Sequence, residues 1–144
     1  MQYSGIPESL YYWIEDGKIV EHIWLRKEGE IVYLGITELG IETMGDPVSL
    51  APNGAGRRVE PFEAVATIES SKWVGPISSP VKGEIIEVNN TLAKNPSAIC
   101  EDPYGNWIVA LKLAEIDLPP SLISGSAGKS LYIKAAKELE ERQS

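Results

Sequence analysis

Glu69-Ser70-Ser71-Lys72-Trp73 is the stretch that decides the fold, because it lies between two segments with the composition of β-strands. The segment before it, 62–69, is rich in small and β-branched residues, and the run after it, 77–88, is also predicted to be extended. Two strands joined across residues 70–75 would place Lys72 at the tip of a hairpin, in contact with solvent. A primary amine in that position is accessible to an acylating enzyme. We therefore expect Lys72 to be the attachment site of a covalent cofactor.

Size and charge limit the classes of protein and partner. The chain has 144 residues with 43% apolar content, which suits one compact domain with a single core. Twenty-one acidic and thirteen basic residues give a net charge of −8, which disfavours phosphate backbones and anionic lipid surfaces. We expect no nucleic-acid or membrane partner. The acidity serves either solubility or docking to proteins with basic faces.

Targeting signals are absent from the sequence pattern. No apolar run is long enough to cross a bilayer, and residues 1–5 lack the charged and then apolar pattern of a signal peptide. We therefore expect a soluble, cytoplasmic protein.

Cysteine and histidine usage limits the chemistry of the polypeptide. Cys100 is the only cysteine, so the chain cannot form an intramolecular disulfide or a four-cysteine zinc site. It has no visible activating partner, and we expect an inert thiol. His22 is the only histidine, and we expect a hydrogen-bonded structural side chain rather than a base or a metal ligand. Any chemistry that needs two sulfurs would require a prosthetic group.

The remaining sequence predicts a mainly β protein with little helix. Strands are expected in 11–24 around an Asp16-Gly17 turn and at 31–36, 48–50, 62–69 and 107–113. In 62–69, alternation places Ala64, Ala66 and Ile68 on one face and Val65 and Thr67 on the other. Helices are expected at 38–44 after an N-cap at Thr37, as a short turn in 92–97, and at 130–141, where Leu131, Ala135 and Leu139 form an apolar stripe.

Separate signatures in this chain resemble those of the glycine cleavage H proteins, over roughly residues 21 to 142. They occur in the family's order and with compatible spacing. The matching stretches are His22-Ile23-Trp24 for the family's His-Glu-Trp, Leu34-Gly35-Ile36-Thr37 for its Gly-Ile-Thr, Glu69-Ser70-Ser71-Lys72 for its Glu-Ser-Val-Lys, Ser79-Pro80-Val81-Lys82-Gly83-Glu84-Ile85-Ile86-Glu87-Val88-Asn89 for its Ser-Pro-Val-Ser-Gly-Glu-Val-Val-Glu-Val-Asn, and Glu101-Asp102-Pro103-Tyr104-Gly105 with Trp107 close behind.

The resemblance implies a biotinyl/lipoyl-type hammerhead β-sandwich with short helices and a C-terminal amphipathic helix. It implies a single lipoyl-carrier domain over 1–144, divided into an N-terminal extension (1–20), the lipoyl β-sandwich (21–113) and a C-terminal helical segment (114–144). Lipoic acid would be amide-linked to Lys72. Biotin carriers usually flank their lysine with methionines, and lipoyl domains of 2-oxoacid dehydrogenases usually lack the Asp-Pro-Tyr-Gly segment and the C-terminal helix.

Four neighbours of the lysine are candidates for its recognition or for the arm's environment. Glu69 has the position of the family's ligase-recognition carboxylate, or is an exposed charge at a strand end. Gly83 is expected to serve a bend, because glycine tolerates unusual dihedrals. Ser71 and Trp73 flank the lysine, and Trp73 would belong to a docking surface, form a lid over the arm, or be a partly buried aromatic.

The expected activity is that of a carrier and not of an enzyme. A lipoyl-lysine arm of about 14 Å would enter partner active sites, among them a lipoate ligase or lipoyl transferase and a dihydrolipoamide dehydrogenase. The family places carboxylates between the early His and Trp and four residues after the lysine, where this chain has Ile23 and Pro76, although Glu21 would restore one.

This departure favours a carrier of sulfur-bound intermediates, working with a heterodisulfide-reductase-like complex in sulfur oxidation. The alternative is a glycine cleavage H protein proper, which carries the aminomethyl group from glycine decarboxylase to aminomethyltransferase. A third class is an unmodified binding module with the same fold.

Overall fold

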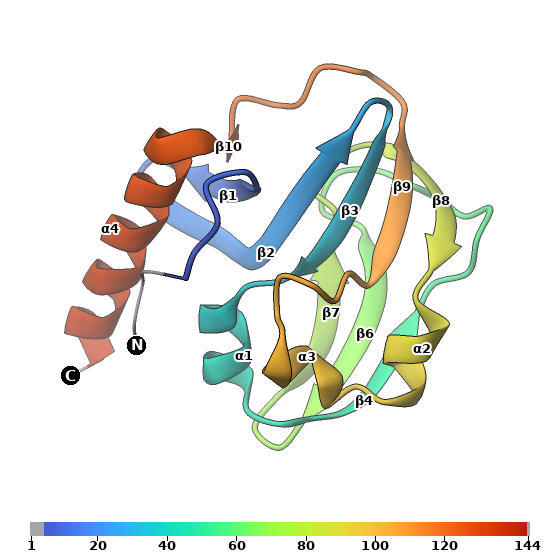
Figure 1. Cartoon of the computed structure of the whole chain (residues 1–144), viewed down its shortest axis with the longest axis horizontal. Helices are drawn as coiled ribbons and strands as arrows, with labels where there is room; N and C mark the ends of the chain where they lie inside the picture. The colour runs from blue at the N-terminus through green and yellow to red at the C-terminus, as the bar shows by residue number, and fades with distance from the viewer. Residues whose placement is uncertain (1–4, 144) are drawn as a thin grey trace.

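The computed structural model describes residues 5–143 as a sandwich of two antiparallel sheets with four helices in that range (Figure 1). One sheet has the strand order β10-β1-β2-β3-β9-β8-β5 and the other β4-β6-β7. The strands are β1 (Tyr11–Glu15), β2 (Lys18–Glu28), β3 (Ile31–Ile36), β4 (Pro47–Pro52), β5 (Arg58–Val59), β6 (Ala64–Ser70), β7 (Val74–Ser78), β8 (Gly83–Val88), β9 (Val109–Leu113) and β10 (Leu122–Ile123). The helices are α1 (Glu38–Met44), α2 (Asn90–Lys94), α3 (Ala98–Glu101) and α4 (Gly125–Gln143).

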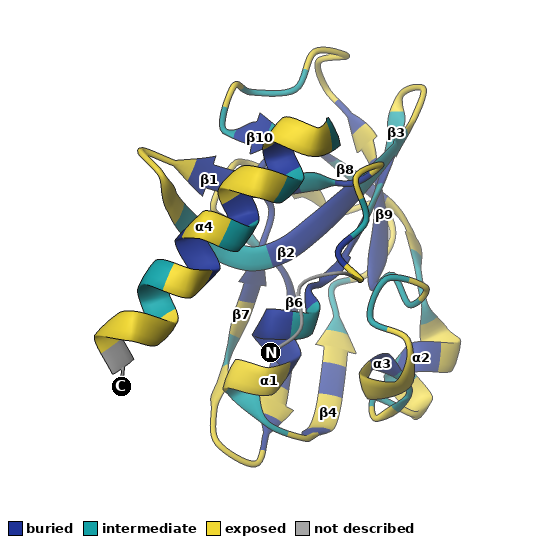
Figure 2. Ribbon diagram, turned by 60° about the vertical axis from the view of Figure 1, so that its left-hand side comes forward, coloured by how far each residue is buried: buried dark blue, intermediate teal, exposed yellow. Residues whose placement is uncertain are grey.

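The main core fills the space between the two sheets. Inward side chains of alternating strand positions pack there and exclude water, which is the main driving force for the sandwich. Figure 2 shows buried positions along the strands, and exposed positions in turns, on the outer helix faces and on the outward side of strands such as β4. Fully buried members of this core include Leu25, Val32, Leu34, Val65, Ile85 and Leu111.

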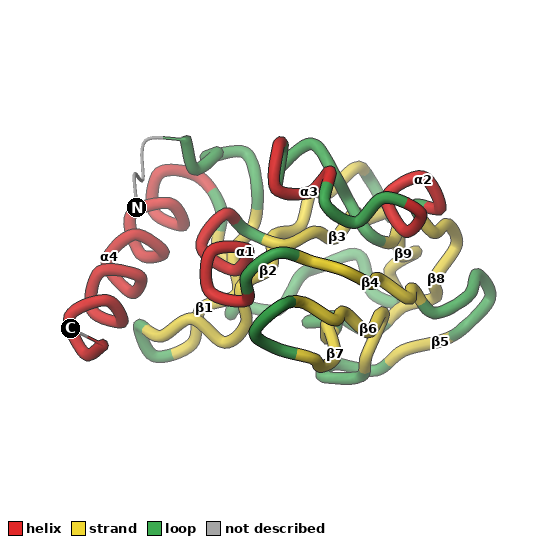
Figure 3. The backbone as a smooth tube through the Cα atoms, turned by 90° about the horizontal axis from the view of Figure 1, so that it is seen from below, coloured by secondary structure: helices red, strands yellow, loops and turns green. Residues whose placement is uncertain are grey.

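A second core lies between α4 and the β1–β2 hairpin. Tyr12 and Tyr132 are fully buried there with ring centroids 4.9 Å apart, and Trp24 packs beside them. The Tyr132 hydroxyl is hydrogen-bonded at 2.7 Å to the Thr37 hydroxyl, which also accepts the Gly40 N–H as the N-cap of α1. The contact ties α4, at one end of the molecule, to the start of α1 (Figures 1 and 3).

The predicted mainly β fold, with its C-terminal helix, is confirmed, but that helix begins earlier than expected. α4 begins at Gly125, not at residue 130, and its buried side is made by Tyr132, Ala135 and Ala136. Leu131, expected in the apolar stripe, is 37% exposed. Tyr132 takes the core-facing position because its hydroxyl finds a buried partner while its ring fills the second core. None of the helices within 5–143 is long and apolar enough to span a membrane.

The sheet also includes segments from outside the predicted β-sandwich body of 21–113. β1 pairs with both β2 and β10, and Trp13 and Leu122, one from each of these outer strands, are opposite one another and buried in the main core. The body of the sandwich therefore uses residues from both flanking segments. Apolar burial, rather than the extent of the family signatures, sets its edges.

Two details of the hairpin in the structure differ from the prediction. The run 77–88 is divided into β7 and β8, which belong to different sheets. In β6, Ala66 and Ile68 are buried and Thr67 is exposed, as the predicted alternation requires, but Val65 is also fully buried. The cause is a shift of register in the pairing with β7 between Ala64 and Ala66. A bulge of this kind turns one extra side chain toward the core.

Candidate functional site

Lys72 lies at the tip of the β6–β7 hairpin, as the sequence predicts, and its side chain is exposed. The tip is fixed to the segment between α1 and β4. The Ser70 hydroxyl donates to the Met44 carbonyl at 2.5 Å, and the Ser71 N–H donates to the Asp46 carbonyl at 3.0 Å. These two bonds flank Gly45, so the hairpin end is held against the C-terminus of α1.

Gly45 supports the stem of the lysine. It has φ 84° and ψ −169°, a backbone conformation that is essentially restricted to glycine. A Cβ at this position would lie 2.5 Å from the Ser71 Oγ and 3.3 Å from the Lys72 Cγ. The missing side chain therefore leaves the space into which the base of Lys72 packs.

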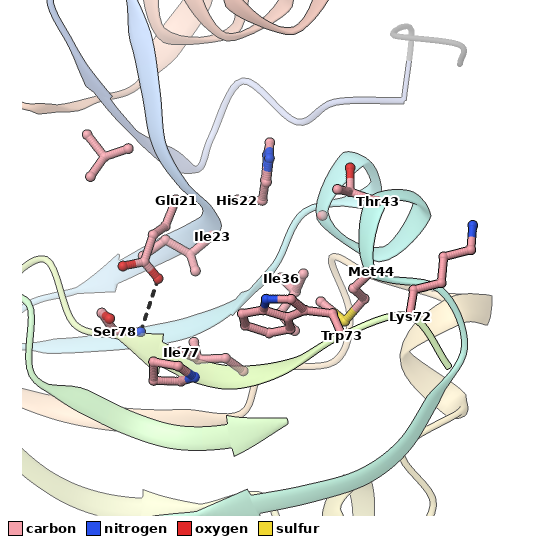
Figure 4. A pocket seen from close by; sticks show the side chains of 13 residues that line it. Glu21, His22, Ile23, Ile36, Thr43, Met44, Lys72, Trp73, Ile77 and Ser78 are labelled. Atoms are coloured by element: carbon pink, nitrogen blue, oxygen red, sulfur yellow. Dashed lines mark hydrogen bonds between the residues drawn. The ribbon is translucent and has the colours of Figure 1, made fainter. Parts of the chain in front are cut away.

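A cleft of about 530 Å³ begins at Lys72 and runs between α1, β2 and the edge strand β7 (Figure 4). Its lining is mostly apolar and includes Ile23, Ile36, Met44, Trp73, Pro76 and Ile77. Both positions at which the family would have carboxylates, 23 and 76, thus lie in its wall with apolar side chains. Pro76 is tolerated because β7 is an edge strand, where a missing N–H need not break the ladder.

Glu21 supplies the one carboxylate among the lining residues described. Its Oε1 accepts the backbone N–H of Ser78 at 3.2 Å, which joins β2 to β7 at the end of the cleft away from Lys72 (Figure 4). The carboxylate is half-buried and already engaged in a hydrogen bond.

His22 also borders the cleft, with its ring directed away from Trp73 and Lys72 (Figure 4). Its carbonyl accepts the Thr37 N–H at 3.0 Å, but the buried Nδ1 has no hydrogen-bond partner among residues 5–143. The expectation of a hydrogen-bonded ring is therefore wrong for this atom within the described chain. Burial lowers the pKa of His22, because an imidazolium there would lose its hydration, and the neutral form is favoured.

The other predicted site residues lie in three different places. Ser71 and Trp73 are beside Lys72, and Glu69 is exposed on the outer face of the same hairpin, opposite Ser49 and Val74. Gly83 does not line the cleft. It lies in β8, where a Cβ would be 2.5 Å from the Lys112 carbonyl oxygen, so it serves a close approach of two backbones and not the unusual dihedral that we predicted.

Cys100 is exposed in α3, outside the cleft lining. Partial burial raises the pKa of its thiol, and the negative charges of Asp46 and Glu101 raise it further. A raised thiol pKa lowers the thiolate fraction and hence the reactivity toward electrophiles.

Sequence reasoning missed the residues that seat the hairpin. The sequence predicted no role at the site for Met44, Gly45 or Ser70. Met44 and Asp46 take part through backbone carbonyls, which leave no signal in the residue types.

Comparison with known proteins gives the family. The family model described as Glycine cleavage H-protein matches residues 11–134. The chain belongs to the glycine cleavage H-protein family. Two relatives come from Sulfurisphaera tokodaii: "Probable glycine cleavage system H protein 3" is 40% identical over 78% of this chain and 80% of its own length, and "Probable glycine cleavage system H protein 2" is 39% identical over 87% and 84%.

A solved structure agrees with the fold. The crystal structure of a glycine cleavage system H protein from Mycobacterium marinum superposes with a TM-score of 0.72 at 26% identity, and covers 88% of this chain and 98% of its own. Glycine cleavage H proteins are carriers without catalytic activity of their own, and their cofactor is lipoic acid bound covalently to a lysine. The hairpin tip of this chain fits such an attachment, because Lys72 is exposed and its side chain points away from Trp73 (Figure 4).

Proposed function

We propose that this H-family protein is a lipoyl carrier with its cofactor amide-linked to Lys72, and that it shuttles a sulfur-bound intermediate in a sulfur oxidation pathway with a heterodisulfide-reductase-like complex. The observation that carries the proposal is the apolar cleft beside Lys72, with Ile23 and Pro76 at the family's two carboxylate positions.

Attachment at Lys72 is supported by the contacts that hold the hairpin end against the C-terminus of α1. Two hydrogen bonds and the Gly45 contact fix the base of the side chain while leaving its amine in solvent. A lipoylating enzyme needs an accessible amine on a rigid turn, and a carrier needs a fixed base under a mobile arm. Lipoic acid supplies two sulfurs that interconvert between disulfide and dithiol, which allows uptake and release of a sulfur-bound group.

The cleft lining supports an uncharged cargo. An ammonium group that leaves water for apolar surroundings loses hydration, which is costly unless a carboxylate replaces it. Here the wall at positions 23 and 76 offers none, and the Glu21 carboxylate is already bound to the Ser78 N–H. A neutral sulfur-bearing group has no such requirement.

The relatives add a second line of support. Two differently numbered H proteins are named in the same organism, Sulfurisphaera tokodaii, and both resemble this chain. One glycine cleavage pathway needs a single type of carrier, so additional members of the family are free to serve other pathways.

Glu21 favours a second candidate, the glycine cleavage H protein proper. Its carboxylate is in the cleft and would pair with an aminomethyl ammonium if it exchanged the Ser78 N–H for that group. In this case the carrier would work with glycine decarboxylase, aminomethyltransferase and dihydrolipoamide dehydrogenase.

Intact mass after co-expression with a lipoyl ligase and lipoate tests the attachment. We expect the mass of one lipoyl group on the wild type and on Lys82→Arg, a matched change at another exposed lysine, and none on Lys72→Arg. An unmodified wild type, or a modified Lys72→Arg protein, would contradict the proposal and favour a binding module.

Exchange of ¹⁴C-bicarbonate by glycine decarboxylase tests the cargo. The lipoylated wild type should support little exchange, and the double variant Ile23→Glu with Pro76→Asp should support more, because it restores carboxylates to the cleft wall. Efficient exchange by the wild type would reject the sulfur setting in favour of glycine cleavage.

A further inference from the structure

We propose that Trp73 is a positioning residue whose indole supports the lipoyl arm along the cleft. The inference rests on the proposed lipoylation of Lys72. It assigns to the residue after the lysine the function of holding the arm against the protein between visits to partners.

The direction of the indole is built into the hairpin. Trp73 is 45% exposed, yet its ring turns back along β7, and a Cβ on Gly75 would lie 2.4 Å from its Cζ2. Only glycine at position 75 leaves that space. The Trp73 backbone is also fixed, because its N–H donates to the Ser70 Oγ at 3.1 Å and its carbonyl accepts the Ser70 N–H at 2.8 Å.

The indole lies across the route that an arm from Lys72 would follow. In Figure 4 the ring is between Lys72 on one side and the Glu21–Ser78 contact on the other, with Met44 and Ile36 beside it. It is the one large aromatic ring among the lining residues. An arm that turned back from Lys72 into the cleft would therefore pass over the indole.

The lengths match. From Val74 to Ser78 the strand rises over four steps, about 13 Å at the usual rise per residue. An extended lipoyl-lysine is about 14 Å long by ordinary bond lengths. When the arm is extended, its methylene part would lie on the indole face and its sulfurs would lie near the far end of the cleft.

The contact suits an uncharged arm. Methylene groups gain from covering an aromatic face, because apolar surface is removed from water. The surrounding Ile36, Met44 and Ile77 side chains add apolar area without adding charge. Trp73 would therefore favour the docked arm in its neutral forms.

The test measures how fast the thiols of the reduced arm react with iodoacetamide, read by intact mass. All proteins are lipoylated, reduced and carry Cys100→Ser, so that the arm provides the only thiols. We expect Trp73→Ala to react about two- to tenfold faster, the range that one methylene group losing its apolar contact with the indole implies. Trp73→Phe should stay close to the wild-type rate.

Gly75→Ala is the second variant, because it keeps the indole but places a methyl group where the ring now lies. We expect it to react faster as well. Val74→Ala is the matched control, since Val74 is 65% exposed and outside the cleft lining, and its rate should be unchanged. Lipoylation should also change the tryptophan emission of the wild type but not that of Trp73→Phe.

Equal rates in the wild type, Trp73→Ala and Gly75→Ala would overturn the inference, as would an emission change that persists in Trp73→Phe. The mass spectrum separates this outcome from failure of the proposed function, because absence of a lipoyl group on the wild-type Lys72 would reject the attachment itself. If the ligase does not accept Trp73→Ala, the rates of Gly75→Ala and Trp73→Phe decide the question.

Discussion

Replacing Gly45 by alanine tests whether the seat of the lysine is as constrained as the geometry indicates. The φ of 84° and ψ of −169° belong to a region that other residues occupy at a cost of about 1–3 kcal/mol. The new Cβ would also lie 2.5 Å from the Ser71 Oγ, which can rotate away, and 3.3 Å from the Lys72 Cγ, which must move. We therefore expect Gly45→Ala to lower the free energy of unfolding by about 1–3 kcal/mol, mainly through backbone strain.

Urea unfolding measures the loss of stability, and lipoylation of the folded variant measures the effect on the site. The kcat/KM of the ligase for the variant should fall, because the new methyl group displaces the Lys72 stem and distorts the two hydrogen bonds that flank Gly45. Adding Ser71→Ala removes the closest overlap, so the double variant should recover part of the lipoylation rate but little of the stability.

The matched control is Gly54→Ala, at a loop position where a Cβ meets nothing within 4 Å and the φ lies outside the strained range. It should change stability by no more than about 0.5 kcal/mol. If Gly45→Ala behaves like this control in both assays, Gly45 does not support the lysine.

Three further predictions concern pH, thiol reactivity and packing. Burial holds the pKa of His22 below its ordinary value. The stability that the neutral ring contributes is therefore full above about pH 6.5 and is lost as the pH falls toward the folded-state pKa. In thermal unfolding from about pH 7 to 5, the Tm of His22→Gln should decline less than that of the wild type. In the unlipoylated chain, the pH midpoint for alkylation of Cys100 should lie above the ordinary thiol range, because burial and the charges of Asp46 and Glu101 raise the pKa of its thiol. Asp46→Asn should lower that midpoint, and an unchanged midpoint would show that Asp46 does not contribute to the shift. Gly83→Ala should lower the free energy of unfolding by about 1–3 kcal/mol, because its Cβ would overlap the Lys112 carbonyl, and a urea midpoint equal to that of Gly54→Ala would contradict this.

The parts of the fold that follow from local pattern were predictable from the sequence. The hairpin tip at Lys72 and α1 with its Thr37 N-cap depend on residues close together in the chain, whose periodicity and capping chemistry are visible. The family signatures then supplied the sandwich, which local pattern alone leaves open.

Long-range contacts were not predictable in the same way. Leu131 and Tyr132 are both reasonable members of an apolar stripe, and the choice between them depends on the Thr37 hydroxyl, which is 95 residues away in sequence from Tyr132. Gly83 gave the signal of any glycine, and only the neighbouring strand reveals that close approach, rather than an unusual φ, requires it.

The candidate site was predictable at its centre and not in its surroundings. Lys72 carries a local motif, whereas the cleft is assembled from α1, β2 and β7, which meet only in the folded chain. Trp73 was left with three readings, because nothing in the sequence states which way an indole turns from a hairpin tip. Its relation to Gly75 is local in sequence, but becomes evident only from the direction of the ring.

The edge of β7 also protects the protein from pairing with other chains. In a strand, alternate N–H groups point to the same side, so the N–H of Ser78, the missing one of Pro76 and that of Val74 face the open edge. Pro76 offers no N–H donor, and the Ser78 N–H is already bound to Glu21. An incoming strand therefore lacks the continuous row of free donors that edge-to-edge pairing requires. A molecule that must dissociate from each partner in turn thereby avoids permanent attachment through its own backbone.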